Sequence, residues 1–311
     1  MEKYCFAADI GGTTVKLGLF NSEGEIVNKW EIPTRTENNG VNILPDIASS
    51  IEEEIKNRGL SKDAIIGIGV GAPGPVDDSG VIYKAVNLGW GVMNIEEELS
   101  KITGLNVKAG NDANVAALGE AWKGGGKGYS DVVVVTLGTG IGGGIIVNGK
   151  ILTGAKGAGG EIGHIHVDDN EEEICSCKNK GCLEQYASAT GVVRLANRKL
   201  ALSDKDSVLR KEPVSSKTVF DAVKAGDELA IEIAEEFGSY LGRGLAAVAC
   251  VTNPKVFVIG GGVSKAGEIL IDYIQKNYIK FVFHASRDTE FKLAKLGNDA
   301  GIIGAAKLVL G

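Results

Sequence analysis

Three cysteines and a histidine lie close together in the middle of the chain. The stretch Cys175-Ser176-Cys177-Lys178-Asn179-Lys180-Gly181-Cys182 comes shortly after Glu161-Ile162-Gly163-His164 and shortly before Glu184. Thiolate sulfur and imidazole nitrogen are the usual ligands of tetrahedral Zn²⁺. Because the polar residues between these cysteines would not bury them in a core, the spacing favours a metal site. Four protein ligands leave no open coordination position, so we expect the zinc to be structural.

Two histidines compete for the fourth ligand position. His164 and His166 would share one face of a strand, so their spacing leaves both open. The other two cysteines, Cys5 and Cys250, lie in apolar runs, and we expect both to be buried. Five cysteines is an odd number, which argues against a disulfide framework.

Two glycine-rich loops each join two apolar runs. Asp9-Ile10-Gly11-Gly12-Thr13-Thr14-Val15-Lys16 follows the run Tyr4–Ala8, and Gly138-Thr139-Gly140-Ile141-Gly142-Gly143-Gly144 follows the run Val132–Leu137. Glycine adopts the dihedral angles of a tight turn without steric cost, so the N–H groups of such loops can converge on an anion. Either loop alone could be an ordinary tight turn. Together they predict that a nucleotide's phosphates are held between two related domains.

An acid precedes the first loop, whereas the second contains a threonine, Thr139, and no acid. Asp9 stands at the end of an apolar strand, where a carboxylate is costly to bury unless it pairs or faces a cation. Mg²⁺ prefers carboxylate oxygen and keeps several of its waters. We therefore expect Asp9 to hold Mg²⁺, either directly or through water.

Three other glycine patterns match nucleotide-binding motifs in letters only. The pattern G-x-G-x-x-G occurs at Gly69–Gly74 and at Gly138–Gly143, but no helix is expected after either stretch. Gly144–Lys150 fits G-x-x-x-x-G-K, yet Ile151 stands where a Mg²⁺-binding Ser or Thr is required. We expect neither a dinucleotide-binding fold nor a P-loop.

Composition narrows the class of protein. The chain has 311 residues, enough for two domains, and a formal net charge of −7 with no basic block, which argues against nucleic acid as the main partner. Its apolar runs fall short of the roughly 20 residues that span a bilayer, so we expect no membrane partner. The N-terminus has no basic segment of a secretory signal, and the cytoplasm is the expected location.

The predicted elements place the loops on sheets flanked by helices. Strands are expected at Tyr4–Ala8, Val15–Phe20, Glu25–Glu31, Ala64–Gly71, Val81–Lys84, Leu105–Ala109, Val132–Leu137, Ile145–Val147, Lys255–Ile259 and Phe291–Ala294. Helices are expected at Gly40–Gly59, Ile95–Thr103, Asn111–Trp122, Lys217–Ala225, Asp227–Val251, Ser264–Tyr278 and Asp299–Leu310. This order predicts an α/β protein with mixed sheets.

These motifs resemble those of the actin/hexokinase/heat-shock-ATPase superfamily. Asp9–Lys16 is similar to its first phosphate motif, Gly138–Gly144 to its second, and Val258–Val263 to its adenosine motif. The stretch from Leu137 to His164 resembles the signature of the ROK (repressor/open-reading-frame/kinase) family, most closely its glucokinase-type sugar kinases. The resemblance implies two ribonuclease-H-like domains flanking a cleft. Residues 1–113 with 299–311 would form the smaller domain, and 114–298 the larger one with the zinc loop.

The resemblance also implies the ligand-binding residues. ATP and Mg²⁺ would be bound by Asp9, Gly11, Gly12, Thr13, Thr14, Lys16, Gly138, Thr139, Gly140, Gly260 and Gly261. The sugar would be bound by Gly74, Asn87, Asn111, Asp112, Glu161, His164 and Glu184. The Glu-x-Gly-His pattern selects His164 as the zinc ligand beside Cys175, Cys177 and Cys182. One departure is Lys178, where many family members have glycine.

Asp112 has two interpretations. An Asp at a strand-to-helix junction is commonly a helix N-cap. Asn111-Asp112-Ala113-Asn114 is, however, similar to the family's sugar-site motif, in which the Asp takes the proton of the sugar 6-hydroxyl. This implies that Asp112 is a general base and that Asn111 contacts the sugar.

The resulting expectation is an ATP-dependent hexose 6-kinase, most closely a glucokinase. Kinases of N-acetylmannosamine, N-acetylglucosamine or fructose remain open, since no residue distinguishes a 2-hydroxyl from a 2-acetamido group. A sugar-sensing regulator of the same family would need a DNA-binding domain, which the expected N-terminal strand leaves no room for. An actin-like filament or chaperone ATPase would not explain the zinc and sugar cluster. Family resemblance suggests a homodimer or homotetramer.

Overall fold

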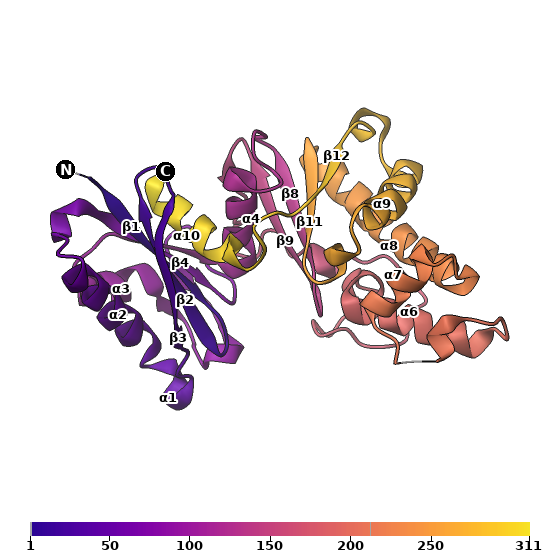
Figure 1. Ribbon diagram of the computed structural model, residues 1–311, viewed down its shortest axis with the longest axis horizontal. Coiled ribbons are helices and arrows are strands. Elements are labelled where there is room, and N and C mark those ends of the chain that lie inside the picture. The colour runs from indigo at the N-terminus through magenta and orange to yellow at the C-terminus, as the bar shows by residue number, and fades with distance from the viewer. Residues whose placement is uncertain (1, 212) are drawn as a thin grey trace. The chain divides into compact units, whose positions relative to one another are not determined.

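The computed structural model describes residues 2–211 and 213–311, which belong to two compact units (Figure 1). Unit 1 comprises residues up to Lys127 together with Lys150–Gly160 and Asn298–Gly311. Unit 2 comprises Gly128–Gly149 and Glu161–Gly297. The chain therefore leaves unit 1, returns briefly, and returns again at its C-terminal end.

Unit 1 contains a five-stranded mixed sheet with the order β3-β2-β1-β4-β7. Its strands are β1 (Tyr4–Ile10), β2 (Thr14–Asn21), β3 (Ile26–Pro33), β4 (Ile65–Ala72) and β7 (Val107–Asn111). The β1–β2 and β2–β3 pairs are antiparallel, whereas β1–β4 and β4–β7 are parallel. The remaining elements of unit 1 are α1 (Glu37–Gly40), α2 (Ile43–Asn57), α3 (Ile95–Thr103), α4 (Asp112–Lys123), α10 (Ala300–Leu310), β5 (Val81–Ile82), β6 (Met93–Asn94) and β10 (Lys150–Ile151).

Unit 2 repeats the same sheet design. Its strands β8 (Val132–Leu137), β9 (Ile141–Val147), β11 (Val256–Gly260) and β12 (Glu290–Leu293) lie in the order β9-β8-β11-β12. The β8–β9 pair is antiparallel, and β8–β11 and β11–β12 are parallel, as in β2-β1-β4-β7. The helices are α5 (Glu184–Ala187), α6 (Ala189–Leu202), α7 (Ser216–Lys224), α8 (Glu228–Thr252) and α9 (Glu268–Phe281). Each glycine loop of the sequence is thus the hairpin between equivalent strands.

Apolar periodicity explains why the predicted helices form. Ile43, Ile47, Ile51 and Ile55 of α2 are all buried in the core of unit 1, as a four-residue spacing predicts. The helix begins at Ile43 rather than Gly40, because Asn38, Asn39 and Gly40 have positive φ angles that interrupt the helix.

Helix α10 packs into unit 1 through glycines (Figure 1, yellow). A Cβ atom at Gly304 would collide with the carbonyl oxygen of Val115 on α4, and one at Gly119 with that of Ala300. A Cβ at Gly69 on β4 would collide with the carbonyl oxygen of Ala305. These close approaches place α4 in unit 1, whereas the predicted division at residue 113 puts that helix in the second domain.

Several sequence expectations differ from the structure. Helices α5 and α6 were not expected, and β9 begins at Ile141, so that three residues, Gly138–Gly140, separate β8 from β9. Helix α9 begins at Glu268, after a separate 3-10 turn over Val263–Ala266. Cys5 is buried as expected, but the expectation for Cys250 is wrong, since it lies on the exposed face of α8.

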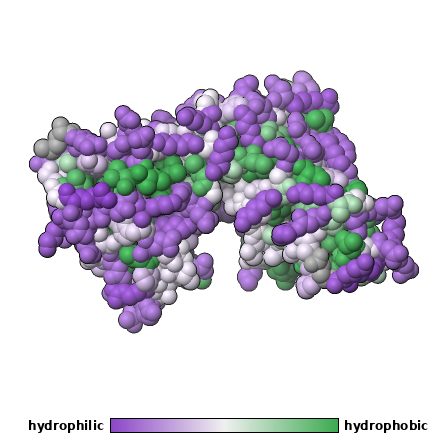
Figure 2. All heavy atoms as spheres, in the orientation of Figure 1, coloured by the Kyte–Doolittle hydropathy of each residue, from purple (hydrophilic) through white to green (hydrophobic). Residues whose placement is uncertain are grey.

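Hydrophilic residues cover most of the face shown in Figure 2. No helix within residues 2–211 and 213–311 combines the length and apolar character that crossing a membrane requires.

The glycine contacts of α10 predict a specific instability. Gly304→Ala should lower the free energy of unfolding by about 1–3 kcal/mol, because neither backbone can retreat without moving a helix. Thermal and urea unfolding would measure this. Gly91→Ala is the control, since a Cβ there meets no atom within 4 Å. Equal stability of the two variants would contradict the proposed close packing.

Candidate functional site

The first glycine hairpin exposes its tip. The amide of Gly11 donates to the carbonyl oxygen of Thr14 at 3.0 Å, and the Thr34 hydroxyl donates to that of Gly11 at 2.7 Å. Gly12 and Thr13 are exposed between these anchors. The predicted phosphate-binding residues Gly11–Thr14 therefore lie together in a turn that these two hydrogen bonds stabilise.

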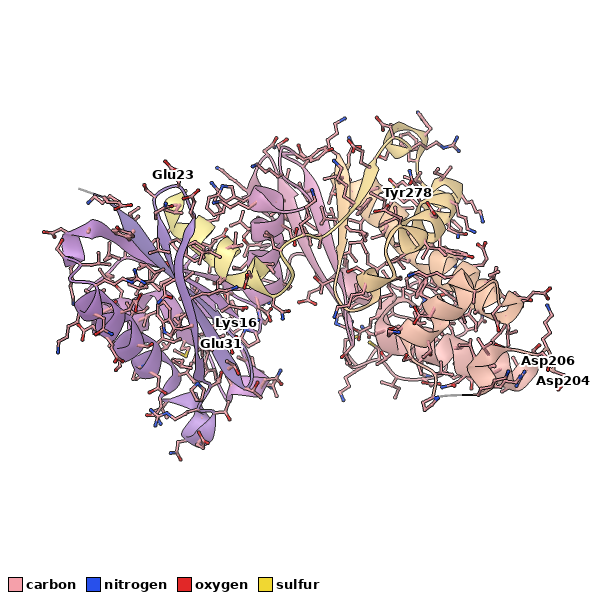
Figure 3. All side chains as sticks on the ribbon, in the orientation of Figure 1. Lys16, Glu23, Glu31, Asp204, Asp206 and Tyr278 are labelled. Carbon is pink, nitrogen blue, oxygen red and sulfur yellow. The ribbon has the colours of Figure 1, made fainter. Side chains whose placement is uncertain are left out.

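Lys16 lies opposite Asp9 in the β1–β2 pair and opposite Glu31 in the β2–β3 pair (Figure 3). Its ammonium group donates to the carbonyl oxygen of Asn298 at 3.2 Å, close to the start of α10. Lys16 thus joins the predicted hairpin to the segment that leads into the last helix.

Asp9 is a half-buried acid near the end of β1. Burial raises the pKa of Asp9 from 3.8 to about 6, Lys16 opposes this rise, and the charge of Asp112 adds to it. A divalent cation would restore the ionised form, so the position fits the expected Mg²⁺.

Gly301, which no motif of the sequence indicates, lies against Asp9. A Cβ atom there would lie 2.3 Å from Oδ2 of Asp9, so a glycine in the first turn of α10 leaves room for this carboxylate as it is placed here. The signal was present in the sequence, because glycine is a poor residue for a helix interior.

Asp112 is not the helix N-cap. Asn111 occupies that position, and its side-chain oxygen accepts from the amide of Asn114 at 3.1 Å. Asp112 is the first residue of α4, and its Oδ1 accepts from the Ala113 amide at 2.8 Å and from Asn111 Nδ2 at 3.0 Å. Asn111 Nδ2 also lies 3.1 Å from the carbonyl oxygen of Gly74. The structure therefore brings Gly74, Asn111 and Asp112 together at the carboxyl end of β7.

The loops near this group differ in their fit to the predicted sugar site. Asn87 is exposed on the 3-10 turn Val86–Leu88, and within the described chain it takes no part in the hydrogen bonds joining Gly74, Asn111 and Asp112. Trp90 is buried and its indole N–H donates to Gly40, which is a packing role.

The second hairpin and the adenosine motif meet in unit 2. Gly138 N donates to the carbonyl oxygen of Gly140 at 3.0 Å, and Thr139 is exposed at the tip. Gly261 has a φ of 84°, and a Cβ atom there would lie 2.5 Å from the carbonyl oxygen of Leu137. The predicted ATP-binding residues Gly138–Gly140, Gly260 and Gly261 are therefore neighbours.

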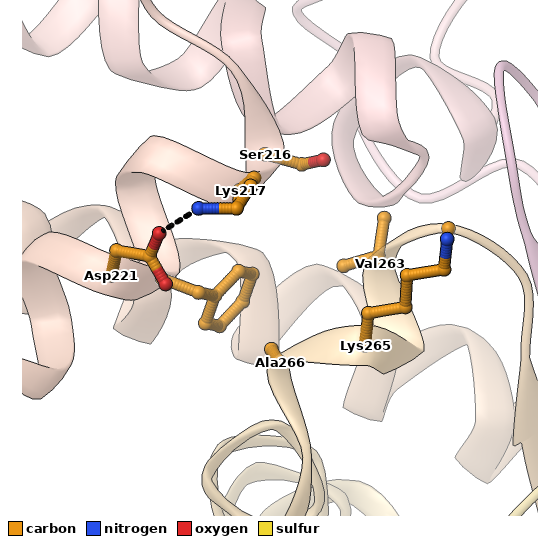
Figure 4. Close-up of a pocket in the computed structure, with 8 residues that line it drawn as sticks. Ser216, Lys217, Asp221, Val263, Lys265 and Ala266 are labelled. Carbon is orange, nitrogen blue, oxygen red and sulfur yellow. Dashed lines mark hydrogen bonds and ion pairs between the residues drawn. The ribbon is translucent and has the colours of Figure 1, made fainter.

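A cavity of about 140 Å³ opens beside the adenosine motif (Figure 4). Lys217 and Asp221 of α7 form an ion pair along one side, and Val263, Lys265 and Ala266 come from the 3-10 turn on the other. The complete lining is Ser216, Lys217, Phe220, Asp221, Gly262, Val263, Lys265 and Ala266. An apolar slot with polar groups at its edge suits a flat heterocycle.

The cysteine–histidine cluster has the dimensions of a tetrahedral metal site. The ligand atoms of His164, Cys175, Cys177 and Cys182 all lie within 4.8 Å of one another. His164 Nδ1 is 3.7 Å from Cys175 Sγ, and the sulfur atoms of Cys177 and Cys182 are 3.5 Å apart. Zn–S bonds of about 2.3 Å in a tetrahedron place sulfur atoms roughly 3.8 Å apart. These residues therefore fit Zn²⁺.

The structure decides between the two histidines. Both ring nitrogens of His166 are engaged elsewhere, with the carbonyl oxygen of Lys180 and with Asp169, each at 2.9 Å. The loop also tolerates the departure at Lys178, which adopts the left-handed φ of 77° that glycine would favour. The Lys178 amide still donates to Cys175 O at 2.9 Å, so the metal turn is preserved.

Two glutamates flank His164. Glu184 Oε1 lies 3.8 Å from Nδ1, and Glu161 Oε2 lies 4.0 Å from Nε2. Nδ1 thus faces the cysteines while Nε2 faces the exposed Glu161, consistent with the predicted double role of His164. Glu184 also accepts from the Ser176 hydroxyl at 2.8 Å.

A buried ion pair involves the segment between His164 and Cys175. Glu171, whose side chain is wholly buried, pairs with Arg194 of α6 and accepts from the Tyr186 hydroxyl at 2.5 Å. Burial alone would raise the pKa of Glu171, but hydrogen bonds from Arg194, Tyr186 and the Glu173 amide outweigh it and lower the pKa from 4.5 to about 2. The sequence analysis missed these residues, because nothing in the sequence pairs Glu171 with Arg194.

A sequence profile of the ROK family matches residues 5–311. The chain belongs to the ROK family. It is 44% identical over 319 residues to the glucokinase of Halalkalibacterium halodurans, covering 99% of this chain and 95% of that protein.

Solved ROK structures share its architecture. The ROK hexokinase of Thermus thermophilus superposes with a TM-score of 0.80 at 31% identity, covering 98% of this chain and 97% of that one. A ROK family glucokinase from Streptomyces griseus, determined in complex with glucose and AMPPNP, gives 0.74 at 32% identity, with 98% of each chain covered. The family and the actin/hexokinase-like two-domain fold expected from the sequence are confirmed.

The buried ion pair of this ROK protein predicts an acid-dependent loss of stability. The lowered pKa of Glu171 contributes stability that is fully present above its ordinary value of 4.5 and is lost as the pH falls through about 2. Glu171→Gln should therefore reduce the free energy of unfolding at pH 7 by about 3 kcal/mol, and by progressively less below pH 4.5.

Urea unfolding of the wild type and of Glu171→Gln between pH 7 and pH 3 measures the difference in their free energies of unfolding. Effects of acid that are common to the two proteins cancel in this difference. Glu173→Gln is the control, because this exposed acid pairs with the same arginines and should cost under about 1 kcal/mol. A difference that does not change with pH would rule out the ionised Glu171.

Proposed function

We propose that this ROK protein is an ATP-dependent glucokinase, transferring the γ-phosphoryl group of ATP to the 6-hydroxyl of glucose. The observation that carries this proposal is the full-length match to a glucokinase at 44% identity. The Streptomyces griseus relative, whose structure includes glucose and AMPPNP, supports the same substrates.

Unit 1 would supply the base and the metal ligand. Asn111 is the N-cap of α4, so Asp112 does not serve as the cap. The Asp112 carboxylate would accept the proton of the 6-hydroxyl as that oxygen attacks the γ-phosphorus and ADP leaves. Asn111, Gly74 and Asn87 would contact the sugar beside it. Asp9 would hold Mg²⁺, which neutralises charge on the phosphates.

Unit 2 would supply the nucleotide grip and further sugar contacts. The amides of Thr139 and Gly140 would bind phosphate, and adenosine would enter the cavity beside Gly260 and Gly261. Glu161, His164 and Glu184 accept hydrogen bonds from sugar hydroxyls, and ionised carboxylates make such bonds strong. Cys175, Cys177, Cys182 and His164 would bind Zn²⁺, which would hold the loop that precedes Glu184.

A phosphorylation assay with glucose, N-acetylglucosamine, N-acetylmannosamine and fructose tests the substrate. Glucose should give the highest kcat/KM. Preference for an acetamido sugar would replace glucokinase with another kinase of the same family.

Asp112→Asn should lower kcat by about 10²–10⁴-fold, because the amide cannot accept the proton. Steady-state kinetics measure kcat, and circular dichroism and glucose binding show that the variant is folded. Asp63→Asn, an exposed acid of the same unit, should keep wild-type turnover. Near-normal turnover of Asp112→Asn would remove this residue from the base role.

Zinc removal should weaken sugar binding more than nucleotide binding. After treatment with a zinc-selective chelator and return to Mg²⁺ buffer, glucose affinity should fall on the order of tenfold, because Glu184 loses its anchored loop. AMP-PNP affinity should fall less, because the cavity is built from α7 and the segment after β11. Calorimetry of both ligands measures this, and equal losses would contradict the assigned role of the zinc.

A further inference from the structure

The first turn of α6 holds the second glycine hairpin by its carbonyl oxygens. The Ala189 amide donates to the carbonyl oxygen of Gly138 at 2.8 Å. The Thr190 hydroxyl donates to the carbonyl oxygen of Thr139 at 2.7 Å. Two consecutive peptide units of the hairpin are therefore anchored on α6.

Anchoring these carbonyl groups also orients the hairpin's amides. In a planar trans peptide the C=O and N–H bonds point to opposite sides. Carbonyl groups of Gly138 and Thr139 that face α6 therefore direct the N–H groups of Thr139 and Gly140 away from it. Because glycine reorients with little steric cost, these anchors decide whether both amides point toward one anion.

The same turn is bonded to the element that carries Glu184. The buried Ser188 hydroxyl donates to the carbonyl oxygen of Glu184 at 2.7 Å and lies 2.9 Å from the Thr190 hydroxyl. The Glu184 carboxylate also borders the hairpin directly, because a Cβ atom at Gly140 would lie 2.6 Å from Oε2. Glu184 and the hairpin are therefore joined through Ser188 and Thr190.

We propose that Thr190 is a positioning residue that couples sugar binding at Glu184 to phosphate binding at Gly138–Gly140, an inference that rests on the proposed kinase function. Its hydroxyl has one proton and two acceptors within reach, Thr139 O and Ser188 Oγ. A sugar bound to Glu184 would fix α5 and Ser188, whose oxygen already accepts from the Gly191 amide at 3.0 Å. The Thr190 hydroxyl then keeps donating to the carbonyl oxygen of Thr139. The hairpin then presents its amides in the orientation that binds phosphate.

Thr190→Val removes the hydroxyl and keeps the shape of the side chain. Calorimetry would measure AMP-PNP affinity with Mg²⁺, in the absence and in the presence of saturating glucose. In the wild type, glucose should tighten AMP-PNP binding. In Thr190→Val, AMP-PNP affinity with glucose should fall about 2- to 12-fold, the range for one lost hydrogen bond, and the tightening by glucose should shrink. Glucose affinity without nucleotide should change less than about twofold, because the variant leaves the Glu184 carboxylate in place.

Two variants separate positioning from general damage. Thr190→Ser keeps the hydroxyl and should restore the tightening by glucose. Thr252→Val removes another hydroxyl–carbonyl bond of unit 2, from Thr252 to Val248 at 2.9 Å, and should leave that tightening unchanged.

Three results would overturn the inference: a wild type without tightening, a Thr190→Val variant with wild-type tightening, or a Thr190→Ser variant that behaves like Thr190→Val. The proposed function fails separately, if the wild type phosphorylates no sugar. A wild type that phosphorylates glucose while Thr190→Val retains full tightening would overturn the role of Thr190 alone.

Discussion

Backbone contact at glycine between α10, α4 and β4 is the constraint on which the chemistry of unit 1 depends. Gly304 and Gly119 let α10 and α4 approach until carbonyl oxygens replace side chains at the interface. The same approach brings Gly301 against Asp9. Asp9 and Asp112 are then close enough for the charge of Asp112 to raise the pKa of Asp9. Close packing thus creates a concentration of negative charge that a metal ion can relieve.

Unit 2 positions its groups by different means. Its hairpin is anchored by hydrogen bonds to α6 rather than by contact at glycine alone, and its cysteine loop has the geometry of a zinc site. The ion pair of Glu171 with Arg194 joins that loop to the same helix. Helix α6 therefore supports both the phosphate hairpin and the cluster around Glu184.

Local patterns were enough to predict much of this arrangement. The isoleucine spacing of α2, the valine run of β8 and the two glycine loops are signals carried by a few neighbouring residues, and each led to the correct element. The cysteine spacing likewise predicted the metal cluster.

The features that could not be predicted from the sequence depend on contacts between segments that are distant along the chain. Gly301 matters because Asp9 is beside it, and Glu171 matters because Arg194 is. The choice of His164 over His166 depends on where Asp169 and Lys180 O lie. The sequence predicts a loop at the glycines of β9, although pairing with β8 keeps them extended. Cys250 was placed in the core because its neighbours are apolar, but its own face of α8 points outward.

The order of segments along the chain has a consequence for biosynthesis. Helix α10 follows every element of unit 2, yet it packs against Gly69 and Gly119 in unit 1. A ribosome adds about 5–20 residues per second, so the sheet of unit 1 waits many seconds for its last helix while unit 2 is being translated. Throughout that interval the backbone at these glycines is not covered by α10. Until α10 is translated, the nascent N-terminal half therefore lacks the helix that covers this surface in the folded protein.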